Sequence, residues 1–512
     1  MFILMRKIPF IFFLLIFITP SISVFAQENS YEKNCQIGIE NYTKLIKKGG
    51  SKIFLASLYT KRASDYVGLK MFNEAIKDDK MAITLDPQNG YTYWDLGTIY
   101  NQKGDFEQAL ANYKKSISIL KDKPGINELE IVYCNAAQDE YMLKRYPEAL
   151  SDDSLSIAAN NQYSRAYDLA GDIHMVIQDF VSADKDYTNA IMNLKNPDDQ
   201  QISILFTKRA DARRSSKKLK DAINDYTLAI KAFAANGIAY WNRAATYHLN
   251  SDYELATADY TKAMEFYKGN NENLSKLYDD RAVNELGQNL DIQAIKDDST
   301  AIAMNANNRI AYFNLANAYT QNADYQKGID VLNKLKTYFP DQKNVLALLY
   351  FNIANNEYFL NQFDKVVDDC SKAIELDPAY SSSYYYRAKV YLKKKNDKQL
   401  AIADFNKVIQ LDTSKKTIDY IFSLFYVGRG DEAAAILQED VLSTTDNALV
   451  LGDYYNLACL YSLMNKPDEA NIYLKKAIDG GYAKKYAIAD EDLDNIRNTD
   501  DYKTTIGIGQ SQ

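Results

Sequence analysis

The residues of this chain that could carry out chemistry are mainly acidic. Adjacent aspartates such as Asp78-Asp79 and Asp297-Asp298 resemble the paired carboxylates of acid–base catalysis. Neighbouring residues on a helix point about 100° apart, so the two carboxylates of a doublet cannot flank one bond. We expect one aspartate of each doublet to pair with an arginine and the other to be solvated. The doublets therefore do not predict an active site.

The sequence offers little material for a metal centre or a nucleophile. Two histidines occur in 512 residues, and the four scattered cysteines form no CxxC motif. The run Asp490–Asp494 has alternating acids like the start of a calcium loop, but Asn495 replaces the required glycine and Asp501 the longer glutamate. A helix start capped by Asp490 is the favoured interpretation. We expect no catalytic residue, no metal and no cofactor, and thus no enzyme.

Composition points to a helical, globular chain that binds through its surface. Hydrophobic residues make up 47% and charged residues 25%, which excludes disorder, and nine prolines with 20 glycines favour helices over turn-rich sheets. The net charge is −8, without a dense basic run, which argues against nucleic acid as a partner. A chain of 512 residues exceeds one ordinary core, so several domains or a repeat array are expected.

Residues 1–26 have the layout of a cleaved secretory signal. Arg6 and Lys7 precede an almost wholly apolar run, Ile8–Ile18, and a small residue stands immediately before Gln27. The apolar run is shorter than the roughly 20 residues of a spanning helix, although a retained anchor is the alternative. We therefore expect an exported protein, periplasmic or extracellular, that keeps no stable membrane span and begins at Gln27.

Internal repeats determine the expected fold. Tyr59–Pro87 and Tyr93–Leu120 share one order of residues: an aromatic, a small residue four later, a tyrosine, a turn, an aromatic and an alanine. The corresponding positions are Ala63 and Gly97, Tyr66 and Tyr100, Phe72 and Phe106, and Ala75 and Ala109. Each segment thus predicts two amphipathic helices joined by a tight turn. This order resembles the tetratricopeptide repeat family, and the resemblance covers about four-fifths of the chain.

The resemblance implies an all-α, right-handed superhelical solenoid of about twelve helix-turn-helix repeats. Repeats are expected to start at residues 56, 130, 203, 275 and 347, and each is followed after 34 residues by another, at 90, 164, 237, 309 and 381. A longer connection follows each second repeat, which indicates that a pair of repeats was the duplicated unit. After the signal, the expected parts are a capping helix in 27–55, ten repeats in five pairs over 56–415, a degenerate repeat in 416–449, a final repeat in 450–484, and a closing segment with tail in 485–512.

Arginines and aspartates recur 16 residues apart across four predicted turns, and 17 apart across a fifth, where the turn in Lys395–Lys398 has one extra residue. Because the turn lies midway between them, antiparallel helices bring the two members to the same height. We interpret them as ion pairs within a repeat rather than as a row of ligand-binding charges. The pairs are Arg62 with Asp78, Arg209 with Asp225, Arg243 with Asp259, Arg281 with Asp297, and Arg387 with Asp404.

An aromatic row marks the expected binding face. In the family the first helices line a concave groove, and the resemblance implies that partners lie there. The candidate groove residues are Trp94, Trp241, Phe313, Tyr385 and Tyr455, with Asn101, Asn317 and Asn355 available to bond a partner's backbone. The alternative is that these rings pack against the neighbouring helix. The family's carboxylate clamp is not matched, since Phe313 stands where a lysine is needed.

These features predict a non-enzymatic scaffold of the cell envelope that binds a protein or peptide in its groove. The alternative is a carbohydrate-binding module, because 41 tyrosines together with asparagine and aspartate suit sugar stacking and hydrogen bonding.

Overall fold

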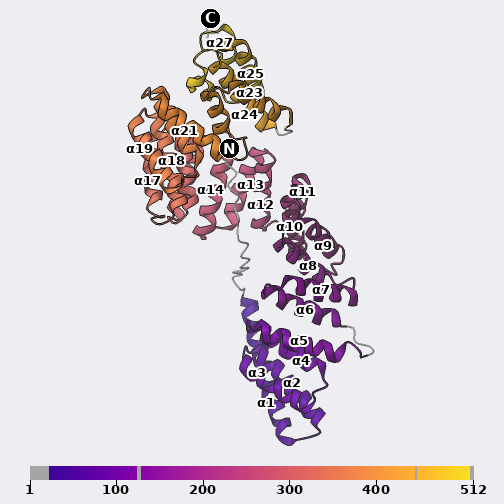
Figure 1. The fold of residues 1–512 in the computed structure, drawn as a ribbon. Coiled ribbons are helices and arrows are strands. Elements are labelled where there is room, and N and C mark those ends of the chain that lie inside the picture. Colours follow the sequence, from indigo (N-terminus) through magenta and orange to yellow (C-terminus); the bar gives the residue numbers. More distant parts are fainter. Residues whose placement is uncertain (1–21, 124–127, 444–446, 508–512) are drawn as a thin grey trace. The chain divides into compact units, whose positions relative to one another are not determined.

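The computed structural model describes residues 22–123, 128–443 and 447–507, and in these ranges the chain is all-α (Figure 1). The described chain falls into two compact units, Met1–Ser251 and Asp252–Gln512. The boundary lies between the two helices of one expected repeat. Residues 1–21, which hold most of the expected signal, lie outside the described residues, as do 508–512 of the tail.

The first unit consists of helices packed in sequential pairs. They are α1 (Ile22–Lys48), α2 (Lys52–Gly68), α3 (Phe72–Leu85), α4 (Gly90–Gln102), α5 (Phe106–Leu120), α6 (Leu129–Met142), α7 (Tyr146–Ala159), α8 (Ser164–Val176), α9 (Phe180–Met192), α10 (Asp199–Ser215), α11 (Leu219–Ala232) and α12 (Gly237–Leu249).

The second unit continues the pattern and ends in shorter elements. Its helices are α13 (Tyr253–Phe266), α14 (Asn271–Gly287), α15 (Asp291–Met304), α16 (Arg309–Gln321), α17 (Tyr325–Lys336), α18 (Lys343–Phe359), α19 (Phe363–Leu376), α20 (Ser381–Lys393), α21 (Lys398–Leu411), α22 (Ile418–Tyr426), α23 (Gly430–Ser443), α24 (Asn447–Leu463), α25 (Pro467–Asp479), α26 (Lys484–Ala489), the 3₁₀ helix η1 (Glu491–Leu493) and α27 (Asp500–Ile506).

A left-handed turn residue joins the two helices of most hairpins. Lys70 between α2 and α3 has φ 57°, and Gly104 between α4 and α5 has φ 79°. One residue in this region reverses the chain without a long loop, so the second helix packs directly against the first. Lys144, Gln178 and Lys217 hold the same place in later repeats of the first unit.

Small residues set how closely the paired helices approach. A Cβ atom added at Gly97 of α4 would lie 2.7 Å from the ring of Tyr113 on α5. The same relation recurs at Gly171 of α8, where the added atom would meet Tyr187 on α9 at 2.5 Å. A residue that carries a side chain would therefore push the tyrosine out of the core.

Helix length explains the alternating spacing of the repeats. The helices α4, α8, α12, α16 and α20 each have 13 residues, whereas α2, α10, α14 and α18 have 17. The longer helix adds one turn at the start of most pairs. At the N-terminus α1 packs on α2, with Cys35 buried, and α1 begins within the expected signal segment.

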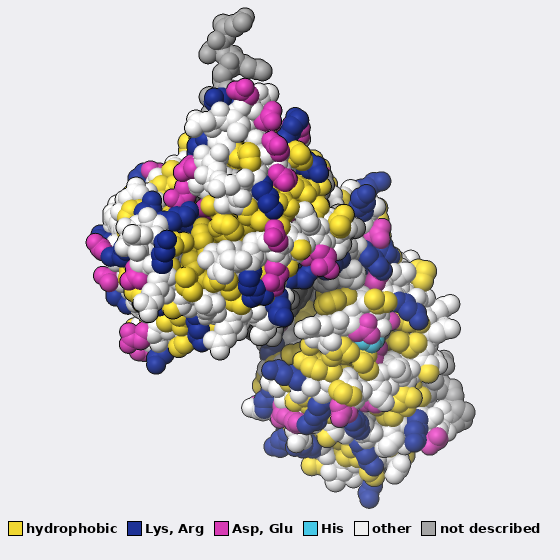
Figure 2. Space-filling model, turned by 45° about the horizontal axis from the view of Figure 1, so that its top comes forward, with side chains coloured by type: hydrophobic (Ala, Val, Ile, Leu, Met, Phe, Trp, Pro, Cys, Tyr) yellow, Lys and Arg dark blue, Asp and Glu magenta, His cyan; other side chains and the backbone are white. Residues whose placement is uncertain are grey.

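The two helices of a repeat form two layers, because first helices also contact first helices. In the first unit α6 contacts α8, and in the second α20 contacts α22 and α22 contacts α24. We call the surface of this layer the first-helix face. On the surface drawn in Figure 2, lysines and arginines are interspersed with acidic side chains and with hydrophobic ones.

The apolar core differs between the regular repeats and the C-terminal end. In the first unit, one cluster links α6, α7 and α8 through Cys134, Ala149 and Leu169. At the end of the second unit, a continuous cluster extends from Tyr384 on α20 to Ile506 on α27. The last repeats and the closing elements therefore share one core.

Candidate functional site

The arginine–aspartate pairs hold the two helices of a repeat together. Nε and Nη2 of each arginine donate to the two carboxylate oxygens of its aspartate, and the side chains are largely buried. The shortest distance is 2.6 Å for Arg62–Asp78, 2.7 Å for Arg209–Asp225, 2.5 Å for Arg281–Asp297 and 2.8 Å for Arg387–Asp404. Arg243 lies on α12 in the first unit and Asp259 on α13 in the second, so the fifth pair stays a prediction.

Each of these arginines also binds the helix that precedes its repeat. Nη1 of Arg62 donates to Thr43 on α1 at 2.9 Å, and Nη1 of Arg281 donates to Thr261 on α13 at 2.8 Å. Arg387 makes the equivalent bond to Ser371 on α19. One guanidinium thus connects three helices. With its donors used inside the solenoid, it has a structural role and not a ligand-binding one.

The expectation that the second aspartate of each doublet is solvated is wrong. Asp79, Asp153 and Asp298 are each at most 1% exposed. Neither carboxylate oxygen of Asp79 or of Asp153 has a hydrogen-bond partner, and Asp298 lies against the carboxyl group of Asp279. Burial raises the pKa of Asp79 to about 8, with a further contribution from Asp95 on α4. The same cause raises the pKa of Asp153 to about 8 and that of Asp298 to about 10. The rotation of about 100° turns these residues toward the next repeat instead of toward water.

The aromatic row divides into half-buried and buried members. Trp94, Trp241 and Phe313 are half-buried, and Trp94 packs against the core between α4 and α6. Tyr385 and Tyr455 are each only 6% exposed and belong to the C-terminal core cluster. These two rings therefore pack, as the alternative interpretation held, and their edges line a surface hollow. The binding role of the row stays a prediction.

The three asparagines of the groove differ in their surroundings. Asn101 donates to Oδ1 of Asp139 on α6 at 2.5 Å, so its amide already ties two first helices together. Asn317 and Asn355 are half-buried. Bonding of a partner's backbone by these residues stays a prediction.

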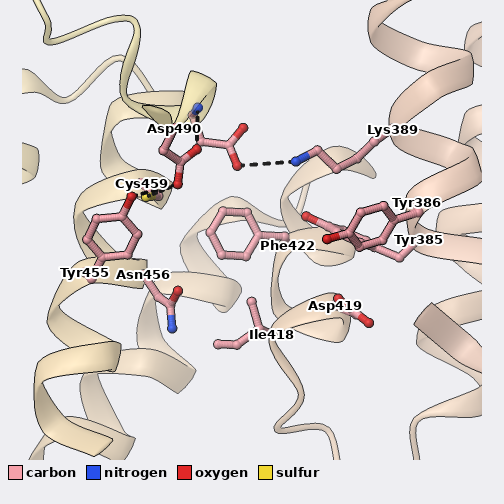
Figure 3. Close-up of a pocket in the computed structure, with 11 residues that line it drawn as sticks. Tyr385, Tyr386, Lys389, Ile418, Asp419, Phe422, Tyr455, Asn456, Cys459 and Asp490 are labelled. Carbon is pink, nitrogen blue, oxygen red and sulfur yellow. Dashed lines mark hydrogen bonds and ion pairs between the residues drawn. The ribbon is translucent and has the colours of Figure 1, made fainter. Parts of the chain in front are cut away.

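A hollow of about 200 Å³ opens on the first-helix face of the second unit, and Figure 3 shows the residues that line it. We call it the C-terminal hollow. Phe422 of α22 lies between the rings of Tyr455 on α24 and Tyr385 on α20, and Ile418 completes the apolar lining. Asn456 of α24 points its amide toward the same space. Aromatic rings thus form the walls of the hollow, and polar side chains lie at its rim.

The hollow arises where the repeat pattern is degenerate. The first helix of this repeat, α22, has nine residues, whereas the first helices α16 and α20 before it have 13. Asp412 shapes the preceding turn by accepting hydrogen bonds from the backbone and hydroxyl groups of Ser414 and Thr417. Thr417 then caps α22. A shorter helix fills less of the space between α20 and α24, and the hollow lies there.

The closing segment supplies the acidic side of the hollow. Asp490 accepts a hydrogen bond from the Tyr455 hydroxyl at 2.8 Å (Figure 3). Asp492 lies 3.7 Å from Nζ of Lys389. Asp419 stands on α22, where burial raises the pKa of its carboxyl although Ser382 and Lys389 oppose that effect. The ammonium group of Lys389 and three carboxyl groups thus stand around the apolar rings of the hollow.

Sequence patterns did not predict most of this site. Tyr385 and Tyr455 were candidates, but Lys389, Phe422 and Asn456 were not, since none belongs to a repeated constellation. The one available signal was the loss of the repeat pattern after residue 415. Asp490 does cap a helix start as expected, through the backbone of Asp492, although the helix is a short 3₁₀ turn.

Within the described residues, no group of three or more histidine, cysteine or acidic side chains is arranged to hold a metal ion. None of the helices in that part of the chain combines the length and apolar character that crossing a membrane requires. The four cysteines are free and buried.

Comparison with known families identifies the repeat. One tetratricopeptide repeat model matches residues 91–121, 381–415 and 454–479, and a second model of the same repeat matches 310–341. These matches coincide with helix pairs of both units. The chain contains tetratricopeptide repeats. It is a non-catalytic scaffold built of these repeats.

Other proteins resemble this repeat protein over parts of its length. DnaJ homolog subfamily C member 7 from Homo sapiens is 23% identical over 350 residues, which cover 64% of this chain and 67% of that protein. A tetratricopeptide repeat protein from Parabacteroides merdae ATCC 43184 superposes with a TM-score of 0.40 at 20% identity, covering 52% of this chain and 99% of its own. Yeast Tom70 gives a TM-score of 0.39 at 16% identity, covering 78% and 94%.

Proposed function

We propose that this repeat protein binds an extended segment of a partner protein on the first-helix face of its second unit. The C-terminal hollow carries this proposal: it takes one apolar or aromatic side chain of the segment between Tyr385, Phe422 and Tyr455. Polar groups at the rim, above all Asn456, bond the backbone on either side. Tetratricopeptide repeat proteins typically bind proteins, which supports the same conclusion.

The size of the hollow favours a side chain over a small molecule. Pockets for small ligands usually measure about 300–1,000 Å³, and this one is about 200 Å³. Burying one large side chain at an interface is commonly worth about 2 kcal/mol or more. A peptide segment adds further contacts along the face, so a hollow of this size is sufficient for one of several anchors.

The burial of the tyrosines disfavours the carbohydrate alternative. A sugar stacks on an open ring face, but Tyr455 already stacks on Tyr482 with ring centroids 4.4 Å apart. Tyr385 contacts Phe405 and Tyr386 edge to face. Because these faces are covered, the hollow presents ring edges and one buried phenyl group, a lining suited to an apolar side chain.

Selection from a random-sequence peptide library tests the proposal. We expect the wild-type protein to enrich peptides that share an apolar or aromatic position. Asn456→Trp fills the hollow and should abolish that enrichment. Asn406→Trp, on the exposed side of α21, makes the same chemical change away from the hollow and should leave enrichment intact.

Thermal unfolding of both variants is the control, with melting temperatures close to that of the wild type expected. Equal enrichment by wild type and Asn456→Trp would show that the hollow is not the binding point. A glycan array scored on the same proteins covers the alternative: glycan binding that Asn456→Trp removes would replace the peptide proposal.

We also propose export to the periplasm or the extracellular space. The support is the order of charged, apolar and small residues in 1–26. Cleavage before Gln27 would shorten α1 but leave Cys35 and the rest of its contact with α2. N-terminal sequencing of the protein from its own cells checks this: a start at Gln27 supports export, and a start at Met1 overturns it.

A further inference from the structure

Three lysines at the end of α20 face an acidic turn of the closing segment. Lys393 Nζ donates to Asp492 at 2.7 Å and to Glu491 at 3.2 Å. Lys394 lies 3.6 Å from Glu491, and Lys389 lies 3.7 Å from Asp492. These contacts connect positions about one hundred residues apart in the chain. We call Asp490–Asp492 the acidic turn.

The acidic turn extends across the first-helix face. From α24, where Asp490 binds Tyr455, it passes the lysines of α20 and reaches α18, where the Tyr358 hydroxyl donates to Glu491. The ammonium group of Lys389 also lies over the rings of Tyr358 and Tyr385. The turn thus forms the acidic side of the C-terminal hollow and continues along the face beyond it.

Other contacts hold the closing segment in place without the acidic turn. Leu493 and Ile496 are fully buried in the C-terminal core cluster. Asn495 donates to the Ser462 carbonyl, and Asn471 of α25 bonds Thr499. The two carboxylates at Glu491 and Asp492 contribute little to this apolar anchoring. They are tied to the rest of the unit mainly by charge and by one tyrosine hydroxyl.

We infer that the acidic turn is an internal occupant of a binding site for an acidic peptide segment of the partner, and that the partner displaces it. The site consists of Lys389, Lys393 and Lys394 with the Tyr358 hydroxyl. The inference rests on the proposed function in that the ligand is a peptide on this face.

The groups around Glu491 stabilise an ionised carboxylate, and an acidic residue of a partner could take its place. Burial opposes ionisation of Glu491, but the Tyr358 hydroxyl and the ammonium groups of Lys393 and Lys389 lower its pKa to about 2. The site therefore selects ionised carboxylates. A partner with two neighbouring acidic residues would form the same ion pairs with the lysines. Replacing the acidic turn by the partner should therefore cost much less free energy than leaving the lysines without carboxylates.

Competition with an attached segment requires a high local concentration of the partner. An attached occupant has an effective concentration in the millimolar range. A partner anchored in the hollow by an apolar side chain would reach a comparable local concentration at the lysines. The two neighbouring sites would then act as one bivalent surface.

Fluorescence anisotropy with fluorescein-labelled hexaglutamate tests the inference. The double variant Glu491→Gln, Asp492→Asn neutralises the acidic turn, and we expect it to bind hexaglutamate at least about tenfold tighter than the wild type. Adding Lys393→Ala should remove the gain. Asp494→Asn is the matched control, since Asp494 is exposed in the same segment and pairs with Arg497 instead.

Two outcomes overturn the inference: no gain in the double variant, or a gain that persists after Lys393→Ala. Circular dichroism melting establishes that the variants fold. A second measurement uses the unaltered protein: saturating hexaglutamate should speed amide hydrogen exchange in 490–494 and leave 500–506 unchanged. Unaltered exchange in 490–494 would also overturn it.

The same probe separates this inference from the proposed function. Asn456→Trp fills the hollow, which Lys389 lines, but Lys393 and Lys394 do not line it. Combining this change with the double variant should therefore keep most of the gain in hexaglutamate binding. If peptide enrichment by the hollow fails while hexaglutamate binding behaves as expected, only the hollow is refuted. The reverse result refutes the acidic site alone.

Discussion

The regular repeats and the C-terminal end of the second unit are stabilised in different ways. In the regular repeats, buried Arg–Asp pairs such as Arg281–Asp297 recur and each links three helices. From α20 onward, a continuous apolar cluster joins the last helices, and lysines bind a segment about one hundred residues away. In the regular repeats, each paired arginine binds residues that lie close to it in the sequence, whereas at the irregular end the paired side chains are distant in the sequence.

This difference indicates where a repeat protein forms a specific surface. A solenoid of identical units presents the same face at each step, because each repeat contacts its neighbours in the same way. Here the short helix α22 interrupts the series, and both the hollow and the acidic turn lie beside it. The interruption thus creates a place on the face that the regular repeats lack.

The largest expected loss of stability comes from truncating a core side chain, and its spread along the chain should differ between the C-terminal cluster and the regular repeats. Phe405→Ala removes a fully buried ring that stacks on Tyr426 and should cost about 3–5 kcal/mol. Because the C-terminal cluster is continuous, hydrogen exchange should accelerate from α20 to α27. Leu169→Ala should cost about 2–5 kcal/mol but speed exchange mainly in α6–α8. Equally local effects of both changes would contradict the contrast.

A smaller effect is expected from one ion pair of the regular repeats. Arg281→Ala should destabilise by roughly 1.5–3 kcal/mol, since charge-assisted bonds are lost and Asp297 stays buried without its partner. Chemical denaturation monitored by circular dichroism measures this loss. Adding Asp297→Ala should recover part of it. A double variant less stable than Arg281→Ala would show that the aspartate has another stabilising role.

A third effect depends on pH and concerns the buried second aspartates. The folded-state pKa of Asp79 is about 8 and lies above its unfolded value, so its stabilising contribution is full below about pH 4 and is lost as pH rises through 8. Asp79→Asn stays neutral at every pH. It should therefore raise the melting temperature by several °C more at pH 8 than at pH 5.

Asp122→Asn, at an exposed aspartate of the first unit, is the control and should show no such difference between the two pH values. A pH-independent effect of Asp79→Asn would mean that Asp79 is ionised in the folded protein. The buried doublets would then resemble the ion pairs of the regular repeats instead of differing from them.

Local patterns predicted the repeats and the ion pairs because both depend on short-range geometry. The starts expected at residues 90, 164, 237, 309 and 381 coincide with the first residues of α4, α8, α12, α16 and α20. A separation of 16 residues across a tight turn places Arg62 opposite Asp78. The third bond, to Thr43, could not be predicted in the same way, because it depends on how successive hairpins stack.

The doublets show where a local rule fails. The geometry of a helix correctly predicts that Asp78 and Asp79 point in different directions. It does not predict which part of the protein covers the side of the helix that carries Asp79. In the structure the next repeat covers it, and Asp79 is buried without a hydrogen-bond partner. Solvation was the wrong expectation because it treated one repeat as if it stood alone.

By itself, the sequence determined an all-α chain of tandem helix hairpins, the positions of their turns, and the pairing of arginine with aspartate inside a repeat. Periodicity and a fixed spacing across one turn are sufficient for these. Only the tertiary structure decided the burial of Asp79, the hollow around Phe422 and the contact of Lys393 with Asp492. Each of these depends on which distant side chains the stacking of helices brings within a few ångströms, and no pattern along the chain encodes that distance.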